Sequence, residues 1–193
     1  MKVLGICGSP RRGGNTDVLL KEALRGAVGA GVEVEEIFLR DKKMSPCLEI
    51  YGCRKDGRCV IQDDFQDVAE KMILADALIL ASPIFFYAVS AHTKILIDRC
   101  QSLWVKQYVL NLPVVPGRSR RRGAFIAVGA TRGKRLFDGV LLTVRYFFDA
   151  LEVDLAETLL VRGVDHKGEI LEHPDLIDKA HELGRKLATG GLP

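Results

Sequence analysis

Short apolar segments alternate with amphipathic segments along the whole chain. The first apolar segment, Lys2 to Cys7, stops at a glycine, and Gly31 to Leu39 alternates apolar and polar residues, so both predict strands. Between them, Val18 to Ala30 places leucine and alanine side chains on one helical face, and Asn15 or Thr16 is expected as the helix N-cap. This stretch therefore predicts a strand, a helix and a second, parallel strand.

The same alternation continues to the end of the chain. Apolar residues at helical spacing follow the expected caps Asp63 and Asp64, and the run Ala77 to Ala81 is apolar throughout, like a strand buried on both faces. Further helices are expected at about 90–103, 136–148 and 176–187, and further strands at 124–128 and 153–161. Five strands alternating with five helices predict one α/β domain over residues 1–193, with a doubly wound parallel sheet and right-handed crossovers.

Composition and charge narrow the range of functions. The chain has 193 residues, 48% of them hydrophobic and 27% charged, which is typical of a soluble globular protein. The formal net charge of +3 is small, so we expect neither nucleic-acid nor membrane binding as the main activity. With no apolar run long enough to cross a membrane and no secretory signal, a cytoplasmic location is expected. In a reducing compartment, the five cysteines are expected as thiols or metal ligands.

Two connections are longer than is usual between neighbouring elements. The first, at about 40–62, is an insertion that holds three of the five cysteines. The second, at about 106–122, ends in the arginine-rich run Arg118 to Arg122, which contains one serine and is flanked by glycines. We expect this run in a solvated loop, with an anion or partner site as the alternative.

The loop that follows the first strand has the composition of an anion site. It runs from Gly8 to Thr16 with the sequence GSPRRGGNT and leads into the first helix. Hydroxyl groups, backbone N–H groups and the positive end of the helix dipole meet there. The loop lacks the Lys and the Ser or Thr of a Walker motif, and it lacks the spacing of a dinucleotide fingerprint. A phosphate monoester is therefore the expected ligand, and a glycine-rich turn without a ligand is the alternative.

The loop that ends the third strand is unusually apolar. Residues Ser82 to Ser90, with the sequence SPIFFYAVS, place four large apolar side chains in a connection. A proline fixes the backbone near its start, so the loop can present a rigid surface to a planar ring. Ligands of doubly wound sheets bind at the carboxyl ends of the strands, where the strand order switches, so both loops are expected at one site. A dimer interface or simple loop packing is the alternative.

Together the two loops resemble those of a known family. GSPRRGGNT is similar to the FMN phosphate loop, and SPIFFYAVSAHTKILIDR to the ring-binding segment, of the NADPH-dependent FMN reductase and iron-sulfur flavoprotein group of flavodoxin-like proteins. The resemblance covers nearly the whole chain. It implies a flavodoxin-like five-stranded parallel sheet of order 2-1-3-4-5 with helices on both faces. It also implies bound FMN and a homodimer or homotetramer with the flavin near a subunit interface. The residues that it implies for FMN are Ser9, Arg11, Asn15 and Thr16 at the phosphate, Pro83, Ile84, Phe85 and Phe86 beside the ring, and Gly129 and Thr131 after the fourth strand.

The cysteine-containing insertion resembles the cluster loop of the iron-sulfur branch, with one ligand replaced. That branch carries four cysteines, and the corresponding positions here are Cys47, Ile50, Cys53 and Cys59. A cubane cluster normally takes four thiolates, and isoleucine offers no lone pair. Three alternatives stay open: a structural loop of reduced cysteines, a cluster held by three thiolates, or redox-active thiols that include adventitious zinc binding. The other two cysteines of the chain, in the first strand and the third helix, are expected in the core.

These motifs predict an FMN-dependent oxidoreductase. NADPH or NADH would reduce the flavin, with its phosphate held by Arg132, Lys134 or the arginine-rich run, and electrons would pass to a small acceptor such as a flavin or a quinone. No catalytic side chain is predicted, because the flavin carries the redox chemistry. The alternative is an iron-sulfur flavoprotein that exchanges electrons with a ferredoxin-like partner. A flavodoxin-fold binding protein that retains no flavin is a third possibility.

Overall fold

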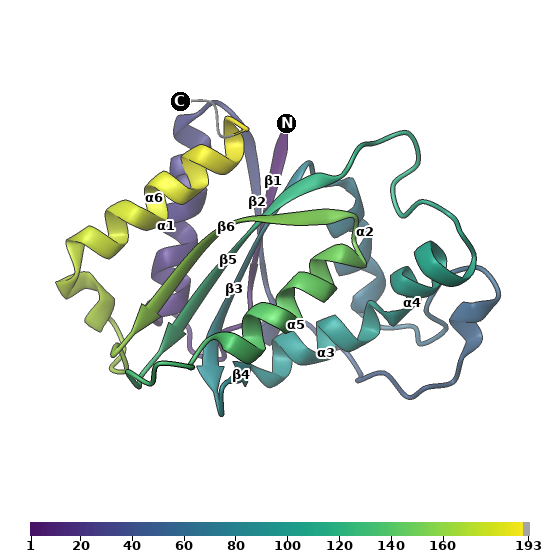
Figure 1. The fold of residues 1–193 in the computed structure, drawn as a ribbon, viewed down its shortest axis with the longest axis horizontal. Coiled ribbons are helices and arrows are strands. Elements are labelled where there is room, and N and C mark those ends of the chain that lie inside the picture. Colours follow the sequence, from purple (N-terminus) through teal and green to yellow (C-terminus); the bar gives the residue numbers. More distant parts are fainter. Residues whose placement is uncertain (191–193) are drawn as a thin grey trace.

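The protein is built around a twisted, mostly parallel sheet. The computed structural model describes residues 1–190. The sheet order is β2-β1-β3-β5-β6, and all four pairings along it are parallel, while the short strand β4 pairs antiparallel with the end of β3. Without β4, this is the flavodoxin-like order 2-1-3-4-5 that the sequence predicts, which is confirmed. Figure 1 shows the strands side by side, with helices on both faces.

The elements follow one another as strand and helix along the chain. The strands are β1 (Lys2–Cys7), β2 (Glu33–Phe38), β3 (Ala77–Phe85), β4 (Ala88–Val89), β5 (Arg121–Gly129) and β6 (Val153–Arg162). The α-helices are α1 (Asn15–Gly29), α2 (Phe65–Leu74), α3 (Ala91–Arg99), α4 (Gln101–Trp104), α5 (Asp138–Asp149) and α6 (Pro174–Ala188). Short helical turns are η1 (Leu39–Asp41), η2 (Gly52–Arg54), η4 (Glu169–Glu172) and the π-helical segment η3 (Val105–Val109).

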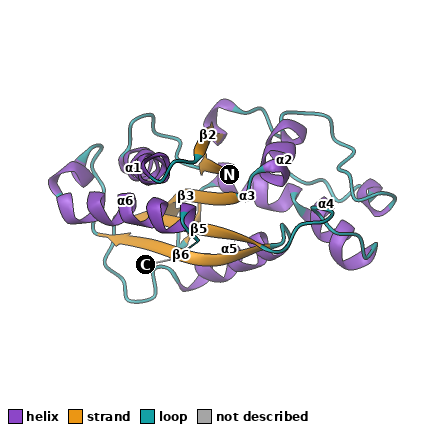
Figure 2. Cartoon of the chain, turned by 90° about the horizontal axis from the view of Figure 1, so that it is seen from above, coloured by secondary structure: helices purple, strands orange, loops and turns teal. Residues whose placement is uncertain are grey.

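Two apolar layers hold the helices on the sheet. One layer lies between the sheet and α2, α3 and α5, and it includes Phe65, Leu96 and Phe148. The other lies between the opposite face of the sheet and α1 and α6. Because β1, β3 and β5 are covered on both faces, most of their side chains are buried, which explains the apolar runs Val3 to Cys7, Ala77 to Ala81 and Ala124 to Val128. Figure 2 shows that the long loop between β2 and α2 lies with α4 at one end of the molecule.

Two local features differ from the sequence-based expectations. Helix α1 begins at Asn15, so its N-cap is Gly14 rather than Asn15 or Thr16. The apolar loop after the third strand is largely a hairpin, because β3 continues to Phe85 and turns into β4. The residues of the turn with positive φ angles are Phe86 and Tyr87 rather than glycines, so the usual sequence signal of a hairpin is missing.

Arg121 corrects the expectation of a solvated arginine-rich run. Its side chain is only 6% exposed, at the first residue of β5. Its guanidinium donates to the carbonyls of Met72 (2.6 Å) and Ala75 (2.9 Å) at the end of α2, and to that of Leu151 just after α5. The last carbonyls of a helix lack partners within the helix and carry partial negative charge. Arg121 therefore caps α2 and also binds the turn that follows α5, although burial lowers its pKa.

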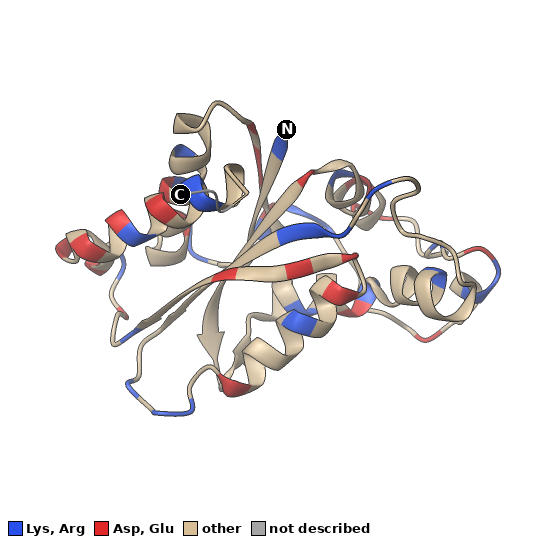
Figure 3. Ribbon diagram, turned by 45° about the horizontal axis from the view of Figure 1, so that its top comes forward, with Lys and Arg blue, Asp and Glu red and all other residues tan. Residues whose placement is uncertain are grey.

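Charged residues of both signs are distributed over the molecule. In Figure 3, basic and acidic segments are interspersed along most of the helices and strands rather than gathered on one face. Within residues 1–190, no helix has the length and apolar composition that crossing a membrane would need.

Candidate flavin-binding site and cysteine loop

The segments that follow β1, β3, β5 and β6 meet at the carboxyl ends of these strands, beside the point where the strand order switches. They enclose a cavity of about 250 Å³. Its lining residues are Ser9, Pro10, Arg11, Gly14, Asn15, Thr16, Pro83, Ile84, Phe85, Val128, Ala130, Val164 and Asp165. The cavity thus has a polar wall from the loop after β1 and an apolar wall from the end of β3. This is the position at which sheets of this order bind ligands.

The start of helix α1 forms the polar end of the cavity. The N-cap residue Gly14 is in an extended conformation, and no side chain caps the helix. Unpaired N–H groups of a first helical turn attract anions, and the helix dipole adds to the attraction. Thr16, 3% exposed, and Ser9, 4% exposed, add hydroxyl groups to the same wall. The arrangement suits a phosphate group.

A buried ion pair fixes the shape of this loop. Arg40, from the turn after β2, donates to both carboxylate oxygens of Asp17 at 3.0 and 2.9 Å. The same arginine donates to the carbonyl of Ser9 (3.0 Å), and Asp17 accepts from the N–H of Gly13 (2.8 Å). The side chains of Arg40 and Asp17 are 9% and 2% exposed. This pair connects the two ends of the phosphate loop, and sequence reasoning missed it because its members are 23 residues apart.

The ion pair also controls the protonation of a neighbouring thiol. Cys7 donates its S–H to Asp17 at 3.0 Å. Burial, together with that carboxylate, raises the pKa of Cys7 far above its usual value, so the residue stays a neutral thiol. Burial lowers the pKa of Arg40, but the hydrogen bonds and charge of Asp17 more than offset this, so the net pKa is raised. The negative charge that Asp17 places near the helix start is therefore always paired with a cation.

Asn15 and Arg11 connect the phosphate loop to the segment after β6. The Asn15 amide oxygen accepts from the N–H groups of Gly168 (3.0 Å) and Ile170 (3.2 Å), and its nitrogen donates to the carbonyl of His166 (2.9 Å). Arg11 donates to the carbonyl of Asp165 (2.8 Å). Both residues line the cavity, but their side chains form hydrogen bonds with the segment after β6.

The hairpin after β3 supplies the apolar wall. Pro83, Ile84 and Phe85 line the cavity, whereas Phe86 lies outside it at the hairpin tip with its side chain fully exposed (101%). Phe86 and Tyr87 have φ angles of +50° and +61°, which are uncommon for bulky residues and cost about 1 kcal/mol or more each. The fold therefore holds a strained turn whose aromatic side chain faces solvent.

The loop after β5 contributes two residues to the lining of the cavity. Val128 and Ala130 line the cavity, whereas Gly129 and Thr131 do not. Gly129 instead accepts the N–H of Gly163 (2.8 Å) and connects β5 to the end of β6. Gly133 lies against the hairpin, because a Cβ atom there would be 2.7 Å from the hydroxyl of Tyr87. The two loops around the apolar wall therefore pack directly on each other.

The cysteine loop, residues 42–64, is organised by a second buried arginine. Arg99 of α3 is 0% exposed and donates to the carbonyls of Ser45 (2.9 Å) and Ile61 (2.9 Å). It also donates to the carboxylate of Asp63 (2.6 Å) and to the sulfur of Cys59 (3.3 Å). Burial alone would raise the pKa of Asp63, but the Arg99 hydrogen bond and two backbone N–H groups lower it overall.

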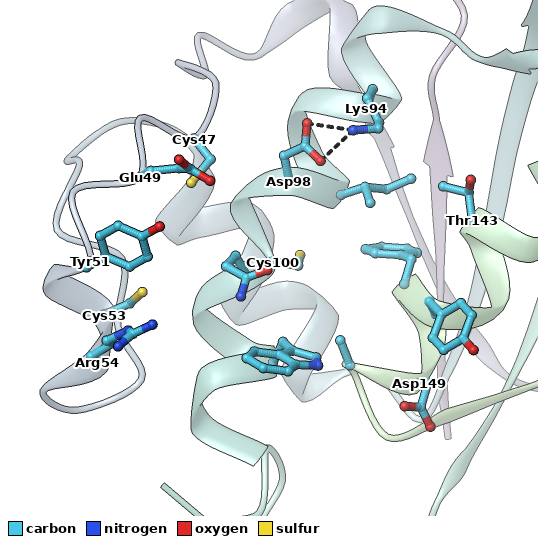
Figure 4. A pocket seen from close by; sticks show the side chains of 16 residues that line it. Cys47, Glu49, Tyr51, Cys53, Arg54, Lys94, Asp98, Cys100, Thr143 and Asp149 are labelled. Carbon is cyan, nitrogen blue, oxygen red and sulfur yellow. Dashed lines mark hydrogen bonds and ion pairs between the residues drawn. The ribbon is translucent and has the colours of Figure 1, made fainter. Parts of the chain in front are cut away.

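The three loop cysteines do not form a compact ligand set. Cys47 and Cys53 line a second, larger cavity of about 930 Å³ between the cysteine loop, α3, α4 and α5, with aromatic residues on its opposite wall (Figure 4). Cys59 faces Arg99. Among residues 1–190, no three His, Cys, Asp or Glu side chains are grouped so that they could hold a metal ion. Cys7 and Cys100 are 0% and 2% exposed, which confirms the prediction that they belong to the core.

The first cavity suits FMN better than the second. It combines an uncapped helix start, two buried hydroxyl groups and an apolar wall at the strand-order switch. Gly8 allows the phosphate loop to pack closely against the start of α3, since a Cβ atom there would be 1.8 Å from the Thr93 hydroxyl. At about 250 Å³ the cavity is small for a ligand pocket, which typically measures about 300–1,000 Å³. It would therefore bury only part of a flavin nucleotide.

The sheet order and the position of this cavity define a protein of the flavodoxin-like class. The sequence model of the NADPH-dependent FMN reductase family matches residues 1–151, so the chain belongs to that family. This confirms the resemblance noted from the two loops.

Individual relatives agree with this assignment. The chain is 42% identical over 132 residues to an iron-sulfur flavoprotein of Methanocaldococcus jannaschii, a match that covers 68% of this chain and 64% of the relative. The chain thus spans less than two thirds of that relative's length. A flavone reductase structure matches with a TM-score of 0.75 at 21% identity, over 99% of this chain and 63% of that one. The NAD(P)H:quinone oxidoreductase of Methanothermobacter marburgensis matches with a TM-score of 0.71 at 17% identity, over 97% and 96%. At these identities the two structures support the fold alone.

Proposed function

We propose that this protein is an FMN-dependent oxidoreductase that takes electrons from NADPH or NADH and passes them to a small acceptor. The observation that carries the proposal is the cavity at the carboxyl ends of β1, β3 and β5, with an uncapped helix start at one end and an apolar wall beside it. Family membership supports the same cofactor and the same electron donor.

The chain's own residues bind and orient the cofactor. FMN, when bound, supplies the redox chemistry, because its ring accepts hydride from a nicotinamide and passes electrons onward. The N–H groups at the start of α1, with the hydroxyls of Ser9 and Thr16, hold the phosphate. Pro83, Ile84 and Phe85 exclude water from one side of the ring. The buried Asp17–Arg40 pair keeps the phosphate loop in its binding conformation before the ligand arrives.

The electron donor is recognised by basic residues beside the same cavity. Arg132 and Lys134 are exposed in the loop after β5, at the carboxyl end of the sheet. The arginine-rich run is at the opposite end, because β5, nine residues long, separates it from this loop by about 26 Å. Arg132 and Lys134 are therefore the candidates for binding a phosphate of NADPH. The acceptor is a small molecule such as a flavin or a quinone.

We also propose that two copies of the chain associate through the hairpin and α5. Phe86, Tyr87, Leu142 and Tyr146 are all more than half exposed on these two elements. Tyr87 and Gly139 are close neighbours, so the hairpin adjoins the start of α5. Exposed apolar patches of this kind mark association surfaces. Light scattering should give twice the chain mass, and a Phe86→Asp, Tyr146→Asp variant should be monomeric; a wild-type monomer at all concentrations would contradict the dimer.

The test of the proposed function is anaerobic mixing of the flavin-loaded protein with NADPH and with NADH. We expect the flavin absorption to bleach with at least one donor. Thr16→Val should weaken FMN binding about tenfold by removing one hydrogen bond to a charged group, measured by flavin fluorescence. Thr158→Val, a matched change on the exposed edge strand β6, should leave FMN binding unchanged. If neither nucleotide reduces the flavin, the proposed donor is wrong.

The alternative is an iron-sulfur flavoprotein that exchanges electrons with a ferredoxin-like protein. It is favoured by the relative of M. jannaschii, whose name is iron-sulfur flavoprotein. In that case the flavin would be reduced by reduced ferredoxin and not by either nicotinamide nucleotide. The same mixing experiment, with ferredoxin as a third donor, distinguishes the two functions.

A further inference from the structure

The cysteine loop lacks the donors of a four-thiolate cluster. Ile50, at the second position of the expected cysteine pattern, has no donor atom, and its side chain is 58% exposed. Cys47 and Cys53 line the large cavity, whereas Cys59 does not line it and accepts a hydrogen bond from Arg99. Among the described residues, 1–190, no grouped set of three candidate ligands exists. The arrangement therefore does not fit the cluster for which the relative is named.

The loop is nevertheless closed, and one side chain closes it. Arg99 contacts four loop residues: Ser45 near its start, and Cys59, Ile61 and Asp63 near its end. Its guanidinium also lies over the ring of Phe65, 4.6 Å from the ring centre. These contacts connect the two ends of the loop to each other and to helix α3.

Further hydrogen bonds reinforce this closure without using any cysteine. Asp63 accepts from the N–H of Ser45 at 2.8 Å, and Asp64 accepts from the N–H of Lys43 at 2.7 Å. The side chain of Gln66 donates to the carbonyl of Ile61 at 2.6 Å. A metal cluster would connect the same distant parts of the loop, but here side-chain and backbone hydrogen bonds already do so.

We propose that in this chain the Arg99 guanidinium, rather than an iron-sulfur cluster, fixes the ends of the cysteine loop and leaves Cys47, Cys53 and Cys59 as reduced thiols. The carboxylate of Asp63 compensates the positive charge of the buried Arg99 guanidinium, whose burial without a partner would destabilise the fold. Cys59 is one hydrogen-bond acceptor among four, so its thiol contributes to the closure without being essential to it.

The first test measures iron and acid-labile sulfide on protein purified anaerobically and then treated with iron and sulfide. The proposal expects less than about 0.2 iron per chain in both samples, whereas a cluster gives roughly equal, near-stoichiometric iron and sulfide. Stoichiometric iron and sulfide would overturn it. FMN is measured in the same samples, so that a failure of flavin binding is seen separately.

The second test follows the order of the loop by trypsin cleavage. Arg54, Lys55 and Arg58 are exposed within the loop, and cleavage there reports how often the loop opens. In metal-free protein we expect slow cleavage, which Arg99→Met accelerates by at least about tenfold. The matched control is Lys94→Met, which removes an exposed cation from the same helix and should leave the rate unchanged.

A third variant keeps the proposal testable if Arg99→Met fails to fold. Cys59→Ser retains a hydrogen-bond acceptor for Arg99 but removes a cluster ligand. We expect its loop to be cleaved within about twofold of the wild-type rate. Faster cleavage of Cys59→Ser, or faster cleavage of the wild type after treatment with an iron chelator, would overturn the proposal.

Discussion

The phosphate loop and the cysteine loop are stabilised in the same way but present different surfaces. Each is held by a buried arginine from another part of the chain that pairs with an aspartate of the loop or of its flanking helix: Arg40 with Asp17, and Arg99 with Asp63. In the phosphate loop, Arg40 donates to a backbone carbonyl and Asp17 accepts one backbone N–H group. The N–H groups at the start of α1 have no side-chain cap. In the cysteine loop, the arginine occupies the acceptors, including a sulfur.

This difference shows what a buried ion pair contributes to a site. The phosphate loop keeps its donors available, so the ion pair preorganises a binding site, and preorganisation reduces the entropy cost of binding. The cysteine loop is long and has few buried apolar residues of its own. Its ion pair, rather than a local apolar core, holds the two ends of the loop together. The same pairing therefore supports ligand binding in one loop and closure in the other.

Of the substitutions in the two loops, removal of Arg40 should have the largest effect on stability and on FMN binding. Arg40→Met leaves Asp17 charged and buried without a partner, which should lower the free energy of unfolding by about 3–5 kcal/mol. Affinity for FMN should fall by more than about tenfold, because the loop loses its binding conformation. Urea unfolding and flavin fluorescence measure the two effects.

The control for this change is Arg12→Met. Arg12 pairs with Asp41 but is largely exposed, so its loss should change stability little. Equal effects of the two substitutions would mean that burial of the Asp17–Arg40 pair is not what stabilises the loop.

A smaller effect is expected in the cysteine loop, with a defined pH dependence. Asp63→Asn weakens the contact with Arg99 and should cost about 1–3 kcal/mol of stability at pH 7. Because the pKa of Asp63 is lowered on folding, its charged form stabilises the protein above its unfolded value of about 4. That contribution is lost as the pH falls through the lower, folded value. Urea unfolding of both proteins from pH 7 to pH 3 should show the difference shrinking below about pH 4, and a constant difference would contradict the assignment.

The smallest perturbation is chemical labelling of the thiols. Cys47 and Cys53 are partly exposed and should react with a thiol reagent in the native state, whereas Cys100 lines the same cavity but is only 2% exposed. Cys7 and Cys100 should react only on unfolding, because burial raises the pKa of both thiols and excludes the reagent. Peptide mapping after labelling identifies the sites, and native labelling of Cys7 would show that the phosphate loop opens more readily than its buried ion pair suggests.

The main elements of the fold could be predicted from local sequence. β1 is predicted with its observed bounds, Lys2–Cys7, since every residue after Lys2 is apolar, as in a parallel strand buried on both faces. The hairpin could not be predicted, because its turn is formed by Phe86 and Tyr87 in a conformation that normally signals glycine or asparagine. Tyr87 of this turn packs closely against Gly133, a contact between distant residues that local sequence does not reveal.

The candidate site was predicted in part. Seven of the ten residues expected at FMN line one cavity, and the exceptions are Phe86, Gly129 and Thr131. The residues that hold the loops in place could not be found from the sequence, because nothing in the pattern around Arg40 or Arg99 identifies a partner 23 or 36 residues away. Local sequence patterns indicate which ligand a loop can bind. The contacts that hold the loop in its conformation are made by residues far apart in the sequence, and local patterns do not reveal them.

The position of Arg121 between α2 and α5 has a consequence for local unfolding. Because one guanidinium binds carbonyls at the end of α2 and in the turn that follows α5, fraying of either helix would remove contacts of a side chain that also holds the other segment. The final turns of these helices should therefore exchange their amide protons at similar rates, as one cooperative unit, although they belong to segments far apart in the chain. The edge of the sheet opposite the ligand would then behave as a rigid base, and motion would concentrate in the loops at the carboxyl edge.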